Sequence, residues 1–170
     1  IQSLLEQASE ATIAVKRLSD DKKEDILRAL AAKLRANIVS ILAENQLDLD
    51  RMPDTDPKKD RLLLSAARIE DLAKSVEEIA ALPDPSNRLL SEKILDNGLL
   101  VQKITVPLGV VGVIYESRPN VTVDVAALCI QSGNVCLLRG GTDAFCTNSY
   151  LVALIQEVLA SFDLDVSIVQ

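Results

Sequence analysis

Histidine and tryptophan are absent from the 170-residue sequence, and phenylalanine and tyrosine occur only twice each. Without histidine the chain can form no Ser-His-Asp triad, no Cys-His pair and no zinc site that needs an imidazole. Its cysteines, Cys129, Cys136 and Cys146, are odd in number and lack zinc spacing, so we expect no metal site. We interpret Cys129 and Cys136, which lie in apolar runs, as small buried hydrophobes, and Cys146 as structural or incidental.

Positive charge is also scarce, because 18 lysine and arginine residues stand against 25 aspartate and glutamate residues, a net charge of −7. Phosphate backbones select basic surfaces, so we expect no nucleic acid partner. No apolar run approaches the roughly 20 residues of a membrane helix, and the first ten residues lack the basic and apolar regions of a signal peptide. We therefore expect a cytoplasmic protein with no membrane partner.

The composition that remains, 48% hydrophobic and 25% charged, can bury one core. We divide the chain into a helical segment (1–84), a β-hairpin (86–107) and a βαβαβ segment (108–170). This order predicts an α/β fold that ends in part of a doubly wound, Rossmann-like parallel sheet. Such a half-sheet leaves an apolar edge uncovered, so we expect the domain to be incomplete.

Helices are predicted for the first segment, because apolar residues recur there at three- and four-residue steps. The first should cover residues 2–18. Ser19 is placed to cap a second helix whose apolar stripe runs to Leu42. A third helix is predicted to start at Asp56-Pro57 and to end at Pro83.

Strands are predicted after residue 86. Asn97-Gly98 is a strong hairpin signal, because both residues tolerate the positive φ of a type I′ turn. Continuous apolar runs follow, which suit strands buried on both faces of a parallel sheet. We expect strand, helix, strand, helix and strand over residues 110–115, 121–131, 135–138, 144–160 and 166–169.

Two loops are candidate ligand sites, because ligands of open α/β sheets bind outside the carboxyl ends of the strands. No G-x-G-x-x-G or P-loop motif occurs, so a nucleotide must be bound by another device. The loop Glu116–Asn120 follows the first parallel strand, and the loop Arg139–Thr142 follows the second.

Each loop has a functional and a purely structural interpretation. Arg139 offers a planar fork of donors that matches a phosphate, and Gly140 and Gly141 allow close approach ahead of a helix N-terminus. The same residues also fit a tight turn with a surface arginine. Asn120 can cap the next helix, or its amide can donate to a developing oxyanion, and geometry must decide.

Three stretches of the chain resemble a known family. Residues 107–124, 132–134 and 138–141 are similar to the N-terminal part of the γ-glutamyl phosphate reductases, or glutamate-5-semialdehyde dehydrogenases, of the aldehyde dehydrogenase-like superfamily. A looser similarity covers the whole chain, including residues 60–62 and 95–98. The resemblance implies an oxidoreductase of proline biosynthesis that reduces γ-glutamyl phosphate to glutamate 5-semialdehyde with NADPH and releases phosphate.

The resemblance also implies roles for the two loops. It makes Asn120 the donor to the oxyanion. It leaves the preference for NADPH over NADH open, because this chain has Thr142 where many members have lysine. Ser117 and Arg118 would bind substrate. The implied cofactor-binding residues are Tyr115, Glu116, Ser117, Arg139, Gly140, Gly141 and Thr142.

The family's nucleophilic cysteine lies in a Ser-x-Cys-Asn-type segment of a catalytic domain that follows these residues, and no cysteine here has that context. In the family, its thiolate would displace phosphate from γ-glutamyl phosphate, and hydride transfer would release the semialdehyde from the thioester. We therefore expect residues 1–170 to be an N-terminal cofactor-binding domain that is inactive alone.

Two other interpretations remain open. The chain could belong to a different aldehyde dehydrogenase-like reductase that acts on another activated acyl group. It could also be a non-catalytic assembly fragment, since antiparallel ribbons readily add to a partner's sheet. In either enzyme we expect a homo-oligomer formed through the hairpin, and NADPH affinity would argue against the assembly fragment.

Overall fold

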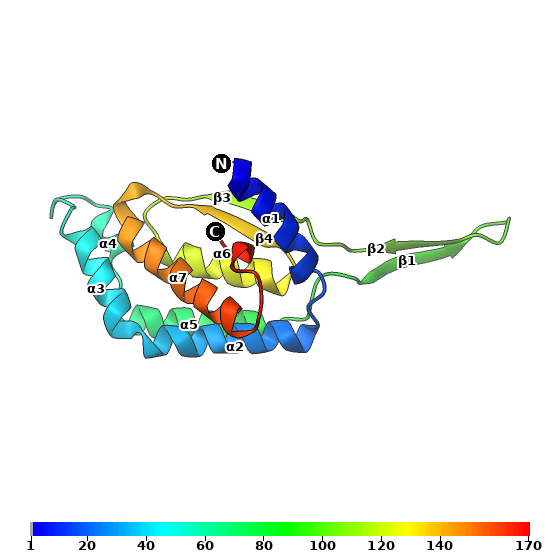
Figure 1. Ribbon diagram of the computed structural model, residues 1–170, viewed down its shortest axis with the longest axis horizontal. Helices are drawn as coiled ribbons and strands as arrows, with labels where there is room; N and C mark the ends of the chain where they lie inside the picture. Colours follow the sequence, from blue (N-terminus) through cyan, green and yellow to red (C-terminus); the bar gives the residue numbers. More distant parts are fainter. Residues whose placement is uncertain (1) are drawn as a thin grey trace.

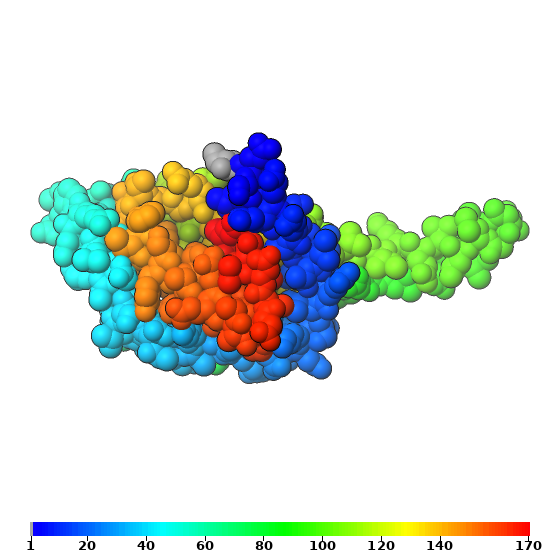
Figure 2. All heavy atoms as spheres, viewed as in Figure 1, coloured from blue at the N-terminus to red at the C-terminus, as the bar shows by residue number. Residues whose placement is uncertain are grey.

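Helices pack against a short parallel sheet, and a β-hairpin projects from this body (Figure 1). The computed structural model describes residues 2–170. The space-filling view in Figure 2 shows the hairpin standing clear of the rest of the molecule. The elements are α1 (Gln2–Val15), α2 (Asp20–Ala36), α3 (Ile38–Leu49), α4 (Lys59–Leu62), α5 (Ala66–Ala80), β1 (Leu89–Ile94), β2 (Leu100–Ile104), β3 (Val110–Ile114), α6 (Pro119–Gln131), β4 (Val135–Arg139), the 3-10 turn η1 (Thr142–Ala144), α7 (Phe145–Ser161) and the 3-10 turn η2 (Val166–Ile168).

The predicted second helix is correct at its start and wrong at its end. Ser19 caps α2 by accepting a hydrogen bond from the backbone N–H of Lys22 at 3.3 Å. The apolar stripe continues past Asn37, but the helix does not. Asn37 leaves helical geometry, with φ at −111°, and its Nδ2 donates to the Lys33 carbonyl at 2.8 Å. This side-chain bond competes with the helical ladder, so α3 starts anew at Ile38.

The single third helix predicted from the sequence is also wrong, because α4 and α5 are separate. Asn45 on α3, fully buried, holds the break between them. Its Nδ2 donates to the Leu62 carbonyl at 2.9 Å, and its Oδ1 accepts from the Leu64 N–H at 2.8 Å. Ser65 then caps α5 by accepting from the N–H of Arg68 at 3.2 Å.

The hairpin forms where it is predicted, but its turn is of another type. The Gly98 N–H donates to the Leu95 carbonyl at 2.8 Å, and the Leu95 N–H donates to the Leu99 carbonyl at 2.9 Å. Within the described chain this turn has a positive φ only at Gly98, +84°, and not at Asn97. Three residues, Asp96 to Gly98, therefore make the loop, which is a type I turn closed by a glycine bulge rather than a type I′ turn.

A buried ion pair fixes the base of the hairpin to the body. Lys23 on α2 pairs with Asp84, and both side chains are almost fully buried. The N–H and hydroxyl of Ser86 each donate to Asp84 Oδ1 at 2.7 Å. Burial opposes ionisation of Asp84, but Lys23 and Ser86 outweigh it and leave the pKa of this carboxyl below its usual value.

The parallel sheet has two strands where three were predicted. β3 and β4 pair in parallel, with Val110 opposite Val135 and Ile114 opposite Arg139. The predicted strand at 166–169 begins instead as the 3-10 turn η2, because Asp165 accepts from the N–H of Ser167 at 2.8 Å. Pairing with β4 starts only at the last two residues, Val169 and Gln170.

Helix α7 is anchored by a buried carboxylate on another helix. Asp48, near the end of α3, is fully buried. It accepts from the N–H of Cys146 at 3.0 Å, from the N–H of Thr147 at 2.8 Å and from the Thr147 hydroxyl at 2.7 Å. These bonds satisfy donors that the first turn of any helix leaves free. They fix the N-terminus of α7 beside the loop that leaves β4.

No helix within residues 2–170 is long and apolar enough to span a membrane.

Candidate functional site

The two candidate loops meet at the carboxyl edge of the parallel sheet, as expected. The N–H of Tyr115 donates to the Arg139 carbonyl at 3.1 Å, which continues the ladder beyond β3. A side-chain carbon placed on Gly141 would lie 3.6 Å from the backbone nitrogen of Ser117. The Ser117 hydroxyl, buried between the loops, donates to Asp143 Oδ2 at 2.9 Å.

A cleft of about 330 Å³, here the β4–α7 cleft, lies on one side of these loops. Of the predicted cofactor-binding residues, Glu116, Ser117 and Thr142 lie outside its lining; Glu116 and Thr142 are exposed, and Ser117 is buried. The exposed guanidinium of Arg139 forms no ion pair within residues 2–170. The lining consists of Tyr115, Leu138, Arg139, Gly140, Gly141, Phe145, Asn148, Ser149, Val152, Ala153, Gln156 and Gln170.

A chain of polar side chains runs along this cleft. The hydroxyl oxygens of Tyr115 and Thr122 are 2.6 Å apart, and the Thr122 hydroxyl donates to Asn148 Oδ1 at 2.9 Å. Burial raises the pKa of Tyr115. Asn148 is only 8% exposed, and its Nδ2 has no hydrogen-bond partner in the described chain. The cleft therefore offers a donor that the protein itself does not use.

Gly140 has a packing reason to be glycine. A side-chain carbon there would lie 2.4 Å from Nδ2 of Asn148 and 3.2 Å from the ring of Tyr115. The space beside Gly140 is thus filled by the chain's own side chains. At Gly141 an added carbon would make only ordinary contacts, so close approach of a ligand stays a prediction there.

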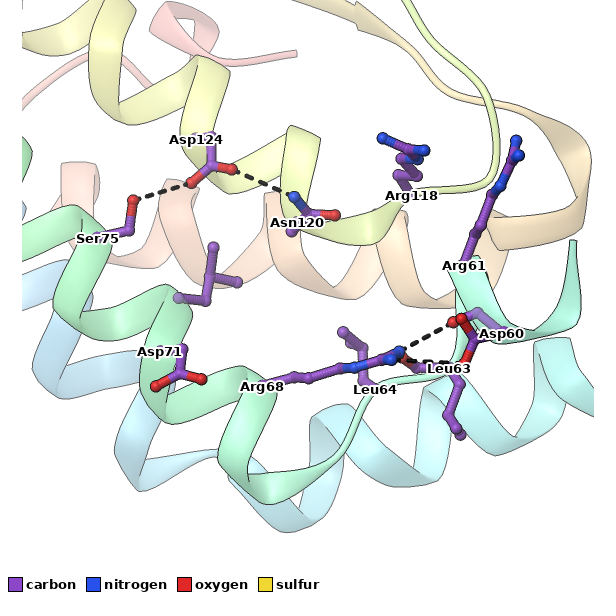
Figure 3. Close-up of a pocket in the computed structure, with 11 residues that line it drawn as sticks. Asp60, Arg61, Leu63, Leu64, Arg68, Asp71, Ser75, Arg118, Asn120 and Asp124 are labelled. Atoms are coloured by element: carbon purple, nitrogen blue, oxygen red, sulfur yellow. Dashed lines mark hydrogen bonds and ion pairs between the residues drawn. The ribbon is translucent and has the colours of Figure 1, made fainter.

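A second cavity, of about 450 Å³ and here the charged cavity, lies where α6 faces the α4–α5 connection (Figure 3). Arg118 and Asn120 border it, so the structure separates these two residues from the β4–α7 cleft. The cavity is lined by Asp60, Arg61, Leu63, Leu64, Arg68, Asp71, Leu72, Ser75, Arg118, Asn120 and Asp124.

The capping interpretation of Asn120 is wrong. Helix α6 begins at Pro119, and Arg118 occupies the N-cap position, where it makes no side-chain cap. Proline suits the first helical position because its missing N–H would have no partner there. Asn120 lies in the first turn, is exposed, and donates from Nδ2 to Asp124 Oδ2 at 3.4 Å.

None of the cysteines has the properties of a nucleophile. Cys129 and Cys136 are buried, as predicted, and Cys146 is partly buried. Partial burial and the nearby Asp48 raise the pKa of the Cys146 thiol, which keeps it protonated at neutral pH. Within residues 2–170 no three side chains gather into a metal site.

Sequence reasoning missed Asn148 in the β4–α7 cleft, and Arg61 and Asp124 in the charged cavity. Asn148 had a signal, because it lies three residues before Leu151 and seven before Ile155, on a stripe that is otherwise apolar. A polar residue on such a stripe must find a partner or a ligand. Asp124 had no comparable signal, since the cavity that it borders is formed together with another helix, α5.

Comparisons with known proteins agree on one family. No family model matches the sequence. The γ-glutamyl phosphate reductase of Legionella pneumophila (strain Lens) is 49% identical over 169 residues, which are 99% of this chain and 40% of that protein. The crystal structure of γ-glutamyl phosphate reductase from Thermotoga maritima matches with a TM-score of 0.91 at 34% identity, over 98% of this chain and 42% of that chain.

A more distant match shows the fold alone. A propionaldehyde dehydrogenase from Clostridium phytofermentans matches with a TM-score of 0.64 at 19% identity, over 99% of this chain and 35% of that chain. The fold is therefore aldehyde dehydrogenase-like. The chain spans about 40% of the length of the Legionella relative. Over that span it is similar to the γ-glutamyl phosphate reductases in both sequence and structure.

Proposed function

We propose that this chain is the cofactor-binding part of an NADPH-dependent γ-glutamyl phosphate reductase of proline biosynthesis. The complete enzyme would reduce γ-glutamyl phosphate to glutamate 5-semialdehyde and release phosphate. The observation that carries the proposal is that the residues of the two loops border two separate hollows. The β4–α7 cleft contains Arg139 and Asn148, and the charged cavity contains Arg118 and Asn120.

The groups in the β4–α7 cleft fit a phosphorylated nucleotide. The unpaired Arg139 guanidinium matches the geometry of a 2′-phosphate, and the free Nδ2 of Asn148 can donate to a ribose or phosphate oxygen. When bound, the cofactor supplies a hydride. We assign its binding to Tyr115, Glu116, Ser117, Arg139, Gly140, Gly141 and Thr142, with Asn148 added from the structure.

The groups beside the charged cavity fit the acyl substrate. We assign Asn120 the role of donating its Nδ2 to the oxyanion that develops on the acyl carbon, a role for which an exposed amide is well placed. Arg118 lies next to it and would bind an anionic group of the substrate. The hydroxyl of Ser117 is already used by Asp143, so Ser117 would contribute its backbone and hold the loop.

The nucleophile would come from a domain outside this chain. No cysteine of the chain combines exposure with a lowered pKa, so residues 1–170 supply binding and orientation but not the covalent step. The enzyme would act in the cytoplasm on this small-molecule substrate.

We also propose that copies of the protein associate with one another through the hairpin. Every residue of β1 and β2 is exposed, including Leu90 (57%), Ile94 (69%) and Leu100 (50%). A two-stranded ribbon with no buried face is marginally stable in water. Covering it with another subunit would bury these side chains and its free strand edges.

The function can be tested by following NADPH oxidation by the complete enzyme after addition of γ-glutamyl phosphate. Arg139→Ala should raise the KM for NADPH about 10- to 100-fold, because a charge-assisted phosphate contact contributes about 1.5–3 kcal/mol. The KM for NADH, which lacks the 2′-phosphate, should change little. Arg17→Ala, at an exposed arginine of the α1–α2 connection, is the control. An equal rise in KM for NADPH and NADH would refute the contact between Arg139 and the 2′-phosphate. Absence of NADPH oxidation by the unaltered enzyme would refute the proposed function.

A further inference from the structure

Two charged side chains of the charged cavity, Arg68 and Asp71, have partners of opposite charge within the chain. Arg68 donates to the carbonyl of Asp60 at 2.9 Å, and its guanidinium lies 3.5 Å from the Asp60 carboxylate. Asp71 pairs with Lys74 at 3.6 Å. These groups have partners and need no ligand.

Three other charged groups of the cavity have no counter-charge. Arg61 and Arg118 form no ion pair with any residue in the described part of the chain. Within residues 2–170, Asp124 accepts only two hydrogen bonds, both long, at 3.4 Å from Asn120 Nδ2 and at 3.4 Å from the Ser75 hydroxyl. Burial raises the pKa of Asp124, so its ionised form would be stabilised by a cation.

The three groups are separated along the cavity. In Figure 3, Asp124 lies toward one end, beside Ser75, and Arg61 and Arg118 lie toward the other, with Asn120 between. A negative end and a positive end complement a ligand that carries both an ammonium and a carboxylate group. The volume of about 450 Å³ is within the usual range for small-molecule sites.

We propose that the charged cavity binds the amino acid head group of the acyl substrate, with Asp124 on the α-ammonium and Arg61 and Arg118 on the α-carboxylate. This inference rests on the proposed function and assigns the recognition of the substrate's α-amino acid group to three side chains. Asn120 makes only a long hydrogen bond to Asp124 within the described chain, and its amide would turn to the reacting carbonyl when the ammonium group binds Asp124. Asp124 is then a residue that determines specificity.

The first test needs no variant. Glutaryl phosphate differs from γ-glutamyl phosphate only in lacking the α-ammonium group. The complete enzyme should reduce it with a kcat/KM about 10- to 100-fold lower, because the charge-assisted contact to Asp124 is lost and its carboxylate stays unpaired. Equal reduction of the two acyl phosphates would overturn the proposal.

The second test asks whether Asp124 is responsible for the preference for γ-glutamyl phosphate over glutaryl phosphate. Asp124→Asn should reduce the preference for γ-glutamyl phosphate to less than about threefold, mainly by raising its KM, because the ion pair is lost while the shape is kept. The KM for NADPH should not change, whereas a general disturbance of the fold would change it. Glu78→Gln removes one charge from the exposed face of α5 and should keep the full preference.

The outcomes separate this inference from the proposed function. If Asp124→Asn keeps the wild-type preference, Asp124 does not bind the ammonium group and the inference is wrong. If the enzyme reduces neither acyl phosphate, the proposed function itself is wrong.

Discussion

Asn120→Asp should lower the kcat of the complete reductase by about 10²- to 10³-fold, the usual effect of losing one donor to an oxyanion. The structure removes the other explanation for this residue, because Arg118 and Pro119 start α6 and Asn120 does not cap it. The substitution replaces a donor with a negative charge at the position proposed to stabilise negative charge. It also places that charge beside Asp124, which now accepts a hydrogen bond from Asn120.

The same substitution should leave the melting temperature within a few degrees of the original. Asn120 is exposed, its one side-chain hydrogen bond is long, and a carboxylate in the first turn of a helix is favoured by the helix dipole. Steady-state kinetics and thermal unfolding on the same preparation distinguish the two effects. A near-normal kcat with unchanged stability would remove Asn120 from the catalytic residues.

Asp48→Asn should reduce the free energy of unfolding by about 3 kcal/mol, because it weakens charge-assisted hydrogen bonds and places an amide N–H against buried donors. Asp48 accepts from two backbone N–H groups and one hydroxyl at the start of α7 and is fully buried. Its negative charge also faces the positive end of that helix. Urea unfolding of the 170-residue chain, followed by circular dichroism, measures the loss.

Asp50→Asn, two residues further along, is the matched control. Asp50 is exposed, and its carboxylate accepts only from the side chain of Gln46 among the described residues, so its substitution should cost less than about 0.5 kcal/mol. If both variants lost a similar amount of unfolding free energy, the hydrogen bonds of Asp48 would not be what holds the N-terminus of α7 in place.

Features that depend on nearby residues could be predicted from the sequence. Ser19 lies at the right distance before an apolar stripe to cap α2, and Gly98 marks the turn of the hairpin. The loops after the two parallel strands could be located because strand order alone brings their ends together. These signals lie within a few positions of the structure that they predict.

The features that were missed depend on distant residues or on competition within a turn. The break between α4 and α5 is held by Asn45, which lies 17 positions from Leu62 in the sequence. Asn37 and Asp165 each redirect the backbone through a side-chain bond that apolar periodicity does not reveal. The charged cavity likewise joins α5 and α6, so its unpaired Asp124 could be recognised only in three dimensions.

Hydrogen exchange of the complete enzyme with and without NADPH tests whether this chain supplies the cofactor site. NADPH should slow amide exchange in residues 115–117 and 139–149, the two segments beside the β4–α7 cleft, and should leave the hairpin, 89–104, unchanged. Saturating NADPH with no protection in either loop would contradict a cofactor site in this chain.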